Sequence, residues 1–262
     1  MTKLKQKEKS GGSVTYPNES TTTVADFASL ADVISGVADL DAFRQAAWTS
    51  WGVASNYWRA PMESRHLPAR MKELVLLAMH ASVTSLNAEA VERHIKRARA
   101  AGATAGEIID VLITIVAVAN HALYFSIPVL QDELGKRGDQ AERLAELDPT
   151  LEAAKRAFIK SRGFWNADRE AIARLMPEYY DALDAVSTES WDNGPLSTKE
   201  RAFICIGIDC TVTHKYEPGL RRHIRNALDL GATGDEILEI FQLSGLLGLE
   251  SYILGAKILS GR

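Results

Sequence analysis

The sequence predicts an all-α protein that contains two copies of one helical bundle domain. Two stretches, HIKRARAAGATAGEI from His94 and HIRNALDLGATGDEI from His223, match at eight of fifteen positions and begin 129 residues apart. Each stretch reads as a helix, a tight Gly-Ala-Thr turn and a second helix. No alternating apolar run bounded by turn residues indicates a β-strand. We therefore expect a duplicated helical bundle, and we call positions 129 residues apart equivalent.

The repeat extends well beyond these two stretches. The offset holds without a gap from about Leu67 to Leu130 in the first copy and from Leu196 to Leu259 in the second. A repeat of this length indicates a duplicated domain, because a solenoid repeats units of about 20–50 residues. The expected division is a flexible N-terminal arm (1–25), a first domain (26–135), a connector (136–149) and a second domain (150–262).

Local signals place three helices in each copy. The first is expected in ARMKELVLLAMHASVT and TKERAFICIGIDCTVT, before the histidine-bearing helix. On the histidine-bearing helix, apolar residues share a face with the histidine, and Gly102 and Gly231 suit the left-handed residue that ends a helix. Thr104 and Thr233 then cap a third, very apolar helix, each with a glutamate three residues later that completes a capping box. Aromatic-rich segments before each copy are expected to add an amphipathic helix.

Composition and charge narrow the class of protein. A hydrophobic content of 46% with 24% charged residues is ordinary for a soluble globular protein. The net charge of −4 argues against nucleic acid as a partner. Cys205 and Cys210 are too few for a disulfide framework, so we interpret them as reduced thiols in a cytoplasmic protein. The N-terminal segment lacks the apolar stretch of a signal peptide.

One segment is long and apolar enough to raise the question of a membrane. Twenty residues from Val111 to Leu130 carry no formal charge, a length that could span a bilayer. The equivalent segment contains Glu250 and Lys257, which a spanning helix rarely tolerates. Because equivalent segments should have equivalent roles, we interpret both as helices buried on nearly all sides, and we expect no membrane partner.

Both copies contain the spacing His-x7-Gly-Ala-Thr-x-x-Glu-Ile, within KELVLLA…ERHIKRARAAGATAGEI and KERAFICIGIDCTVTHKYEPGLRRHIRNALDLGATGDEI. This arrangement resembles the carboxymuconolactone decarboxylase family, which shares the all-α fold of alkylhydroperoxidase D. The resemblance implies a homo-oligomer, with a trimer favoured for a two-copy chain, equivalent to a hexamer of single copies. The nearly uncharged third helices agree with this expectation, because they need another surface to cover them.

One branch of the family reduces peroxides with a Cys-x-x-Cys pair that precedes the histidine by seven and four residues. Here those positions are Asn87 and Ala90 in the first copy and Tyr216 and Gly219 in the second. A low-pKa thiolate at a helix start depends on such a pair. The sequence therefore argues against a peroxiredoxin or alkylhydroperoxidase-type antioxidant protein, which we keep as an alternative. The two cysteines lie in the preceding helix and are interpreted as small buried hydrophobes.

His94 and His223 match the catalytic histidine of the family, and each could act as a general acid or base. Basic residues surround both, and positive neighbours would lower the pKa of an imidazole and keep it neutral. Such residues could also bind a carboxylate, although most of them suit the solvated face of an amphipathic helix. The expected substrate-binding residues are Arg221, Arg222, Arg225 and Tyr216.

The two copies differ at four polar positions. The residues and their equivalents are Glu73 and Ala202, His80 and Asp209, Ser85 and His214, and His121 and Glu250. This asymmetry indicates that one copy, more plausibly the second, keeps an active pocket. His121 and Glu250 lie in apolar helices, so each needs a polar partner. We expect that partner to be His94 or His223.

The resemblance implies a gamma-carboxymuconolactone decarboxylase-like lyase that acts on a small anionic lactone or keto acid. Acid/base chemistry would suffice, because the carbonyl of the substrate takes the electron pair, and no cofactor is expected. The expected catalytic residues are His223, His214, Glu250, Asp209, His94 and His121. Asp209, His214, His223 and Glu250 could in principle supply two histidines and a carboxylate to a metal ion, but their spacing matches no compact ligand motif, so no metal is expected. A non-enzymatic binding or assembly protein, whose histidines are core groups, is the other alternative.

Overall fold

The computed structural model describes residues 29–34, 40–46, 48–138, 149–162, 165 and 167–259. The predicted arm (1–25) and most of the predicted connector (136–149) lie outside the described residues. All regular secondary structure in the described part is helical, which confirms the predicted class. In chain order the helices are α1 (Leu30–Val33), α2 (Leu40–Ala46), α3 (Trp48–Glu63), α4 (Ala69–Ala81), α5 (Ala88–Ala100), α6 (Ala105–Val118), α7 (His121–Lys136), α8 (Pro149–Arg162), α9 (Ala167–Leu175), α10 (Pro177–Asn193), α11 (Thr198–Cys210), α12 (Glu217–Asp229), α13 (Gly234–Gly245), the 3-10 helix η2 (Leu246–Gly248) and α14 (Leu249–Leu259).

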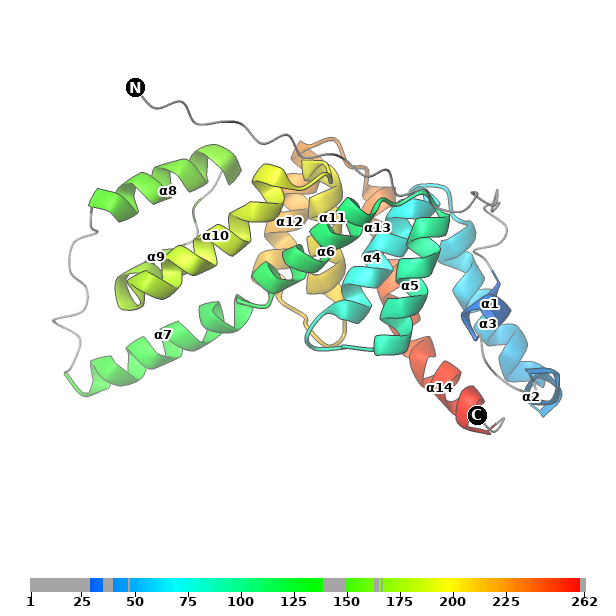
Figure 1. Ribbon diagram of the computed structural model, residues 1–262. Coiled ribbons are helices and arrows are strands. Elements are labelled where there is room, and N and C mark those ends of the chain that lie inside the picture. The colour runs from blue at the N-terminus through cyan, green and yellow to red at the C-terminus, as the bar shows by residue number, and fades with distance from the viewer. Residues whose placement is uncertain are drawn as a thin grey trace, which may run out of the picture.

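The duplication is visible in the helix boundaries. α4, α5 and α6 recur as α11, α12 and α13, and each pair of helices starts 129 residues apart. The same shift relates α3 to α10, so the repeat reaches further towards the N-terminus than the sequence comparison indicates. In Figure 1, α7 and α14 leave the centre of the molecule towards opposite sides. The duplicated helical bundle is therefore confirmed.

The turns between the helices form as predicted. Gly102 and Gly231 have φ values of 92° and 81°, which lie in the left-handed region where a Cβ would be strained. Thr104 and Thr233 each accept a hydrogen bond from the backbone N–H three residues later, and the glutamates there accept one in return. Both capping boxes are thus complete, and they fix where the apolar helices α6 and α13 begin.

The main core lies where the two copies meet. α4 and α11 pack against each other at the centre, and α6 and α13 pack on both of them. Every residue of α4 from Met71 to His80 is buried, as expected of a helix that is surrounded on all sides. The hydroxyl of Thr84 donates a hydrogen bond of 3.2 Å to the hydroxyl of Thr213, its equivalent. Contact between equivalent residues places a local two-fold axis between the copies.

Two buried ion pairs join the copies. Lys72 Nζ lies 2.9 Å from Glu239 Oε1, and Arg201 Nη2 donates a hydrogen bond of 2.9 Å to Asp110 Oδ2. The pairs are equivalent, with the copies exchanged, and all four side chains are almost completely buried. Removing one partner of either pair would leave the other charge uncompensated in a low-dielectric interior, which is strongly unfavourable. The ion pairs therefore fix one orientation of the two copies.

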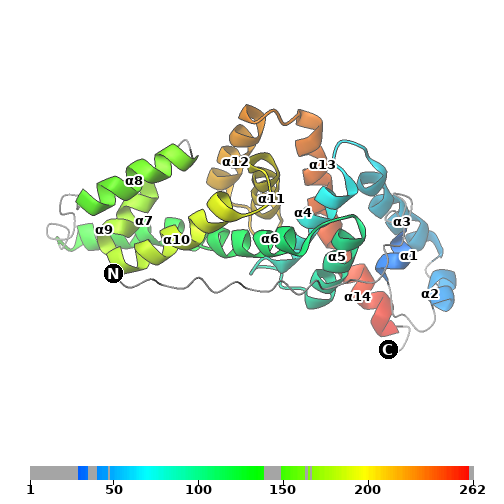
Figure 2. The ribbon, with the colours of Figure 1, turned by 45° about the horizontal axis from the view of Figure 1, so that its top comes forward.

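A smaller lobe lies at one end of the molecule, where α7, α9 and α10 pack together beside α8. Figures 1 and 2 both place this lobe at the end opposite to α1–α3 and α14. Its buried residues are Ile127, Ile172, Ala173, Tyr180 and Leu183. α9 packs against both α7 and α10, so this lobe brings segments of the two copies together.

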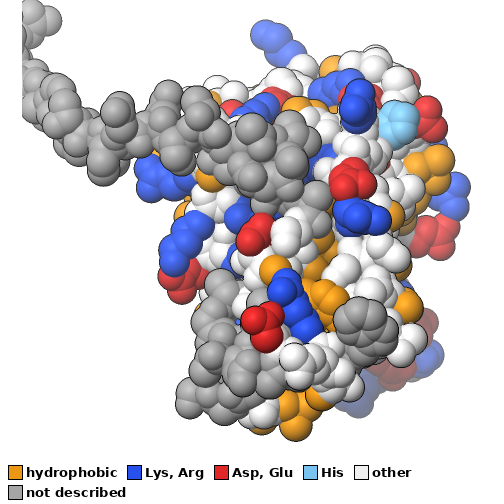
Figure 3. Space-filling model, turned by 90° about the vertical axis from the view of Figure 1, so that its right-hand side faces the viewer, with side chains coloured by type: hydrophobic (Ala, Val, Ile, Leu, Met, Phe, Trp, Pro, Cys, Tyr) orange, Lys and Arg blue, Asp and Glu red, His pale blue; other side chains and the backbone are white. Residues whose placement is uncertain are grey.

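The apolar helices keep one face exposed, so the expectation that they are buried on nearly all sides is wrong for the single chain. Phe125 is 73% exposed, and Leu254, its equivalent, is 51% exposed. By length and composition alone, Ala105–Lys136 and Gly234–Leu259 could each cross a membrane, a test that core helices of soluble proteins also pass. Figure 3 shows apolar side chains between charged ones at the end formed by α1–α3 and α14. Exposed apolar residues thus recur at equivalent positions in the two copies.

Candidate active site

Each copy contains a cluster of titratable side chains around its histidine-bearing helix, and each cluster includes a residue from the other copy. The first cluster consists of Glu73, His80, Arg93, His94, Arg97 and Glu250. The second cluster consists of His121, Asp209, His214 and His223. α7 of the first copy brings His121 to the second cluster, and α14 of the second copy brings Glu250 to the first. The local two-fold axis accounts for this exchange.

In the first cluster, Glu73 orients His94. His94 Nδ1 lies 2.8 Å from Glu73 Oε2, and Arg97 donates a hydrogen bond of 3.0 Å to the other oxygen. Burial lowers the pKa of His94. Burial by itself raises the pKa of Glu73, but the bond from His94 and the charge of Arg97 hold that pKa below its ordinary value. Neutral His94 therefore donates from Nδ1 to an ionised carboxylate, and its lone pair is on Nε2.

Aromatic rings close the space around His94. His80 stacks on the imidazole with ring centroids 5.0 Å apart, and Trp58 stacks on it with centroids 6.4 Å apart. Glu250 accepts a hydrogen bond of 2.9 Å from Asn87 Nδ2 and pairs with Arg93. His94 is completely buried. The first cluster is thus part of the packed interior.

The first cluster makes the stability of the fold depend on pH. Burial, together with the nearby His94 and Arg93, lowers the pKa of His80 to about 2. Between that value and its ordinary pKa, His80 is protonated in the unfolded chain and neutral in the folded one. The contribution of His80 to the free energy of unfolding should therefore be fully retained above about pH 6.5 and be lost as the pH falls below it, by at most about 1.4 kcal/mol per pH unit.

Urea denaturation at about pH 7.5 and about pH 5 measures this dependence. A His80→Gln variant, which has no proton to gain, should show a shallower loss of stability between the two pH values. Equal losses in the variant and the parent chain would assign the acid sensitivity to other groups.

The second cluster is built around a buried carboxylate. Asp209 Oδ1 lies 3.3 Å from His121 Nδ1 and 3.5 Å from His214 Nε2, and Asp209 Oδ2 lies 3.9 Å from His223 Nε2. His121 Nδ1 and His214 Nε2 are 3.1 Å apart. Burial, together with the neighbouring His121, lowers the pKa of His214. Within the described residues, neither oxygen of Asp209 accepts a hydrogen bond of acceptable geometry.

Close packing holds the second cluster in place. The ring of Tyr216 stacks on His121 with centroids 4.0 Å apart. A Cβ added at Gly219 would lie 2.5 Å from Asp209 Oδ2 and 3.1 Å from His121 Cε1, so only glycine fits at this position without a shift. The backbone of α12 therefore approaches the carboxylate closely.

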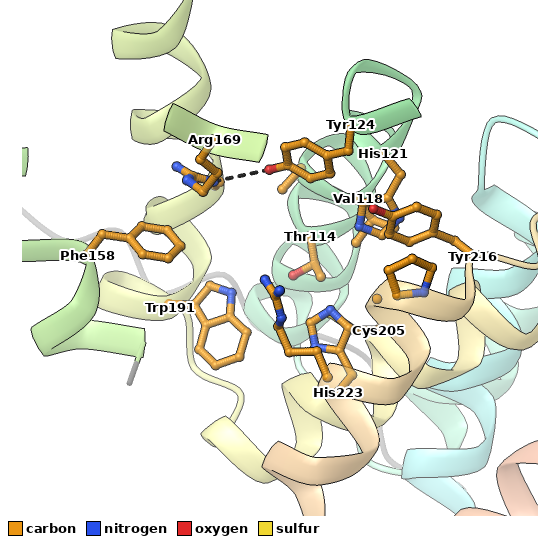
Figure 4. Close-up of a pocket in the computed structure, with 15 residues that line it drawn as sticks. Thr114, Val118, His121, Tyr124, Phe158, Arg169, Trp191, Cys205, Tyr216 and His223 are labelled. Atoms are coloured by element: carbon orange, nitrogen blue, oxygen red, sulfur yellow. Dashed lines mark hydrogen bonds between the residues drawn. The ribbon is translucent and has the colours of Figure 1, made fainter. Parts of the chain in front are cut away.

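Beside the second cluster lies a cavity of about 110 Å³. A single water needs roughly 10–15 Å³ on this measure, so the cavity has room for a small metabolite. Figure 4 shows His121, Tyr124, Thr114 and Val118 from α6–α7 on one side, with Phe158, Arg169 and Trp191 facing them across the space. The remaining lining residues are Ala117, Ser187, Cys205, Tyr216, Pro218, Gly219, Arg222 and His223.

Smaller side chains explain why this cavity adjoins the second cluster. Trp58, which covers His94 in the first cluster, is equivalent to Ser187, which lines the cavity. On the opposing wall, the lining residue Thr114 is equivalent to the larger buried residue Leu243. These substitutions remove volume next to His223 and leave room for a ligand. Thr114 and Leu243 lie within the segment in which the sequence shows the 129-residue offset, whereas Trp58 and Ser187 lie before it.

Two arginines, Arg169 and Arg222, line the cavity. Arg222 lines it, whereas Arg221 and Arg225 are exposed on other faces of α12, and Arg221 pairs with Glu217. Of these three arginines, only Arg222 therefore lies where it could contact a ligand in the cavity. Arg169, which no sequence pattern indicated, donates hydrogen bonds to Asp184, Tyr124 and Ser187. Its source, α9, lies outside the segment in which the repeat was detected.

The structure also redistributes the other predicted residues. Glu250 was grouped with the second copy, but it lies in the first cluster with His80 and Arg93, and the grouping is wrong. His121 lies beside Asp209 and His214, so a residue of the first copy completes the second cluster. Tyr216 lines the cavity.

Neither cysteine is placed as the peroxidase branch requires. Cys205 is buried and lines the cavity, and burial raises the pKa of the Cys210 thiol to about 11. Both cysteines are unlinked by a disulfide. A thiol with a raised pKa is a poor nucleophile.

Comparison with known proteins places these clusters in context. The sequence profile of the carboxymuconolactone decarboxylase family matches residues 45–124 and 177–248, one match in each copy. A protein from Burkholderia xenovorans LB400, assigned as a gamma-carboxymuconolactone decarboxylase subunit, has a similar crystal structure at 1.70 Å resolution. The TM-score is 0.80 at 29% sequence identity, over 92% of this chain and 97% of that one. No curated protein sequence matches the chain.

Proposed function

Because this chain belongs to the carboxymuconolactone decarboxylase family, we propose that the second cluster and its cavity form the active site of a decarboxylase-like lyase. The substrate would be a small anionic lactone or keto acid. The observation that carries the proposal is the cavity itself, which adjoins His223 and the cationic Arg222 in one copy, whereas the first cluster is filled by Trp58.

The residues around the cavity suit the bond changes of a decarboxylation. Arg222 would bind a carboxylate of the substrate. The carbon–carbon bond to a carboxylate of the substrate breaks, and carbon dioxide leaves. The electron pair of that bond moves into the conjugated carbonyl. His223 would then donate a proton to the carbon that carries the resulting charge. Asp209, 3.9 Å from His223, would stabilise the protonated form of the imidazole.

The direct test is the release of carbon dioxide from a panel of cyclic and unsaturated di-acids, including lactones. Turnover of at least one compound by the parent chain would support the proposal. The absence of turnover across the panel, with intact folded protein, would favour a non-enzymatic binding or assembly role. In that case His223→Ala would change the melting temperature, and there would be no catalytic rate for it to change.

Substrate binding provides a more specific prediction. An Arg222→Gln variant is expected to raise KM by about 10-fold or more, because a hydrogen bond to a charged group contributes about 1.5–3 kcal/mol. Arg225→Gln is the matched control, since Arg225 lies on the same helix but is exposed. Steady-state kinetics with the best substrate measures both. Equal effects of the two substitutions would remove Arg222 from the binding site.

The antioxidant alternative receives no support from the site. The positions of the Cys-x-x-Cys pair are Tyr216 and Gly219 in the second cluster, and Tyr216 stacks on His121 instead. A double variant with Cys205→Ser and Cys210→Ser separates the alternatives. Peroxide turnover that depended on these thiols would favour the antioxidant function over the lyase.

We also propose that the protein forms a homo-oligomer of three chains. Exposed apolar residues occur at equivalent positions in α7 and α14, which supports this proposal. The apolar face of α7 in one chain could pack against the apolar face of α14 in a neighbouring chain. Light scattering should give about three times the 28.7 kDa mass of the chain. A Phe125→Glu variant is expected to shift this mass towards the monomer. An unchanged mass would place the interface elsewhere.

A further inference from the structure

We propose that His121, Asp209 and His214 bind one divalent first-row transition-metal ion next to the cavity. The sequence predicts no metal here, because the spacing of these residues along the chain matches no ligand motif. Spacing along the chain does not show that α7 of the first copy supplies His121 to the second cluster.

The positions of the three ligand atoms suit a single ion. His121 Nδ1, His214 Nε2 and Asp209 Oδ1 form a triangle with sides of 3.1, 3.3 and 3.5 Å. A point about 2 Å from all three atoms exists, and this is the usual bond length from zinc to imidazole nitrogen or carboxylate oxygen. Two histidines and one carboxylate on one side of an ion leave other coordination positions open.

The environment of Asp209 provides a second, independent observation. Its side chain is completely buried, and neither of its oxygens accepts a hydrogen bond among the described residues. A buried carboxylate without donors is unfavourable unless a cation compensates it. An ion held by Asp209 and the two imidazoles would supply that compensation. Tyr216 and Gly219, which pack on His121 and Asp209, would hold the ligands in place.

The first cluster shows what a comparable set looks like when it is already satisfied. His80, His94 and Glu250 also bring three ligand atoms within 4.8 Å of one another. There, however, Asn87 and Arg93 donate hydrogen bonds to Glu250, and the guanidinium would repel a metal ion. We therefore expect one ion per chain and not two.

The position of the ion would suit the proposed reaction. His223 lies 3.9 Å from Asp209 Oδ2, so it borders the ion without being needed as a ligand. With one coordination position open towards the cavity, the ion would bind and polarise the carbonyl that accepts the electron pair. This role rests on the proposed function, whereas metal binding itself does not.

The test is a calorimetric titration of untagged, chelator-treated protein with Zn²⁺, repeated with Co²⁺ to record its visible absorption. We expect one ion per chain. Asp209→Asn and His214→Gln should each weaken binding by about 100-fold or more. His66→Gln, an exposed histidine outside both clusters, and His80→Gln should bind as the parent chain does. In the parent chain Zn²⁺ should raise the melting temperature, and in Asp209→Asn it should not.

Two results would overturn the inference: no binding by the parent chain, or binding that both Asp209→Asn and His214→Gln retain. His214→Gln guards against a misfolded Asp209 variant, because His214 is only partly buried. The titration needs no substrate, so its outcome is independent of the proposed lyase activity. Specific metal binding without decarboxylation would support the metal site and contradict the proposed reaction. Decarboxylation without metal binding would support the reaction and contradict the metal site.

Discussion

A His223→Gln variant is expected to lose decarboxylation by about 10²–10⁴-fold, the usual contribution of a positioned general acid or base. His223 lines the cavity and is the titratable residue next to both Arg222 and the buried carboxylate of Asp209. Glutamine retains much of the volume of the imidazole but cannot carry a proton. The measurement is kcat/KM for the best di-acid, together with the melting temperature of the variant.

The equivalent substitution in the first copy is the matched comparison. His94 is fully buried and hydrogen-bonded to Glu73, with Trp58 stacked on its ring. His94→Gln is therefore expected to lower the melting temperature and to leave kcat of the folded fraction nearly unchanged. Loss of kcat in His94→Gln with full activity in His223→Gln would assign the reaction to the first copy.

The second large effect is expected from Asp110→Ala, which should lower the free energy of unfolding by about 3–5 kcal/mol. The substitution leaves the guanidinium of Arg201 buried at the boundary between the copies, without its carboxylate. Glu239→Ala, at the equivalent position, leaves Lys72 in the same situation and should have a similar effect.

Urea denaturation with a constant m-value measures both losses. Glu92→Ala is the control, because it removes an exposed ion pair with Lys96 on the surface of α5. Such a pair contributes little in water, so no measurable change is expected. If Asp110→Ala were as mild as Glu92→Ala, the inter-copy ion pairs could not be what fixes the orientation of the two copies.

The sequence contained most of the information for the fold. Gly102 and Gly231 adopt the predicted left-handed conformation, and Thr104 and Thr233 complete the predicted capping boxes. These features are local, so residue type and spacing suffice to predict them. The exposed apolar face of α7, which includes Phe125, could not be predicted, because apolar content does not show whether the same chain or another one covers a helix.

The candidate site could be predicted only in part, for a geometric reason. The 129-residue offset pairs His121 with Glu250, but it does not show that each lies against the histidine helix of the other copy. That exchange follows from the two-fold arrangement of α4 and α11, which exists only in three dimensions. Arg169 contributes from α9, which lies before the segment in which the sequence shows the repeat, and its equivalent position holds the apolar Leu40.

Helix periodicity limited the prediction for the arginines. Arg221 and Arg222 are adjacent in sequence, but consecutive residues of an α-helix point about 100° apart because a turn contains 3.6 residues. Only Arg222 lines the cavity, while Arg221 lies in solvent beside Glu217. Without the position of the cavity, the sequence could not distinguish them.

The exchange of His121 and Glu250 between the copies has a consequence for how this protein could have diverged. Single-copy subunits in a ring are encoded by one gene, so every pocket must change together. Fusing two copies into one chain lets the two halves mutate separately. Trp58 can then fill the space beside the first cluster, while Ser187 leaves a cavity beside the second. Because each cluster includes a residue from the opposite half, neither half expressed alone would contain all the side chains of its cluster.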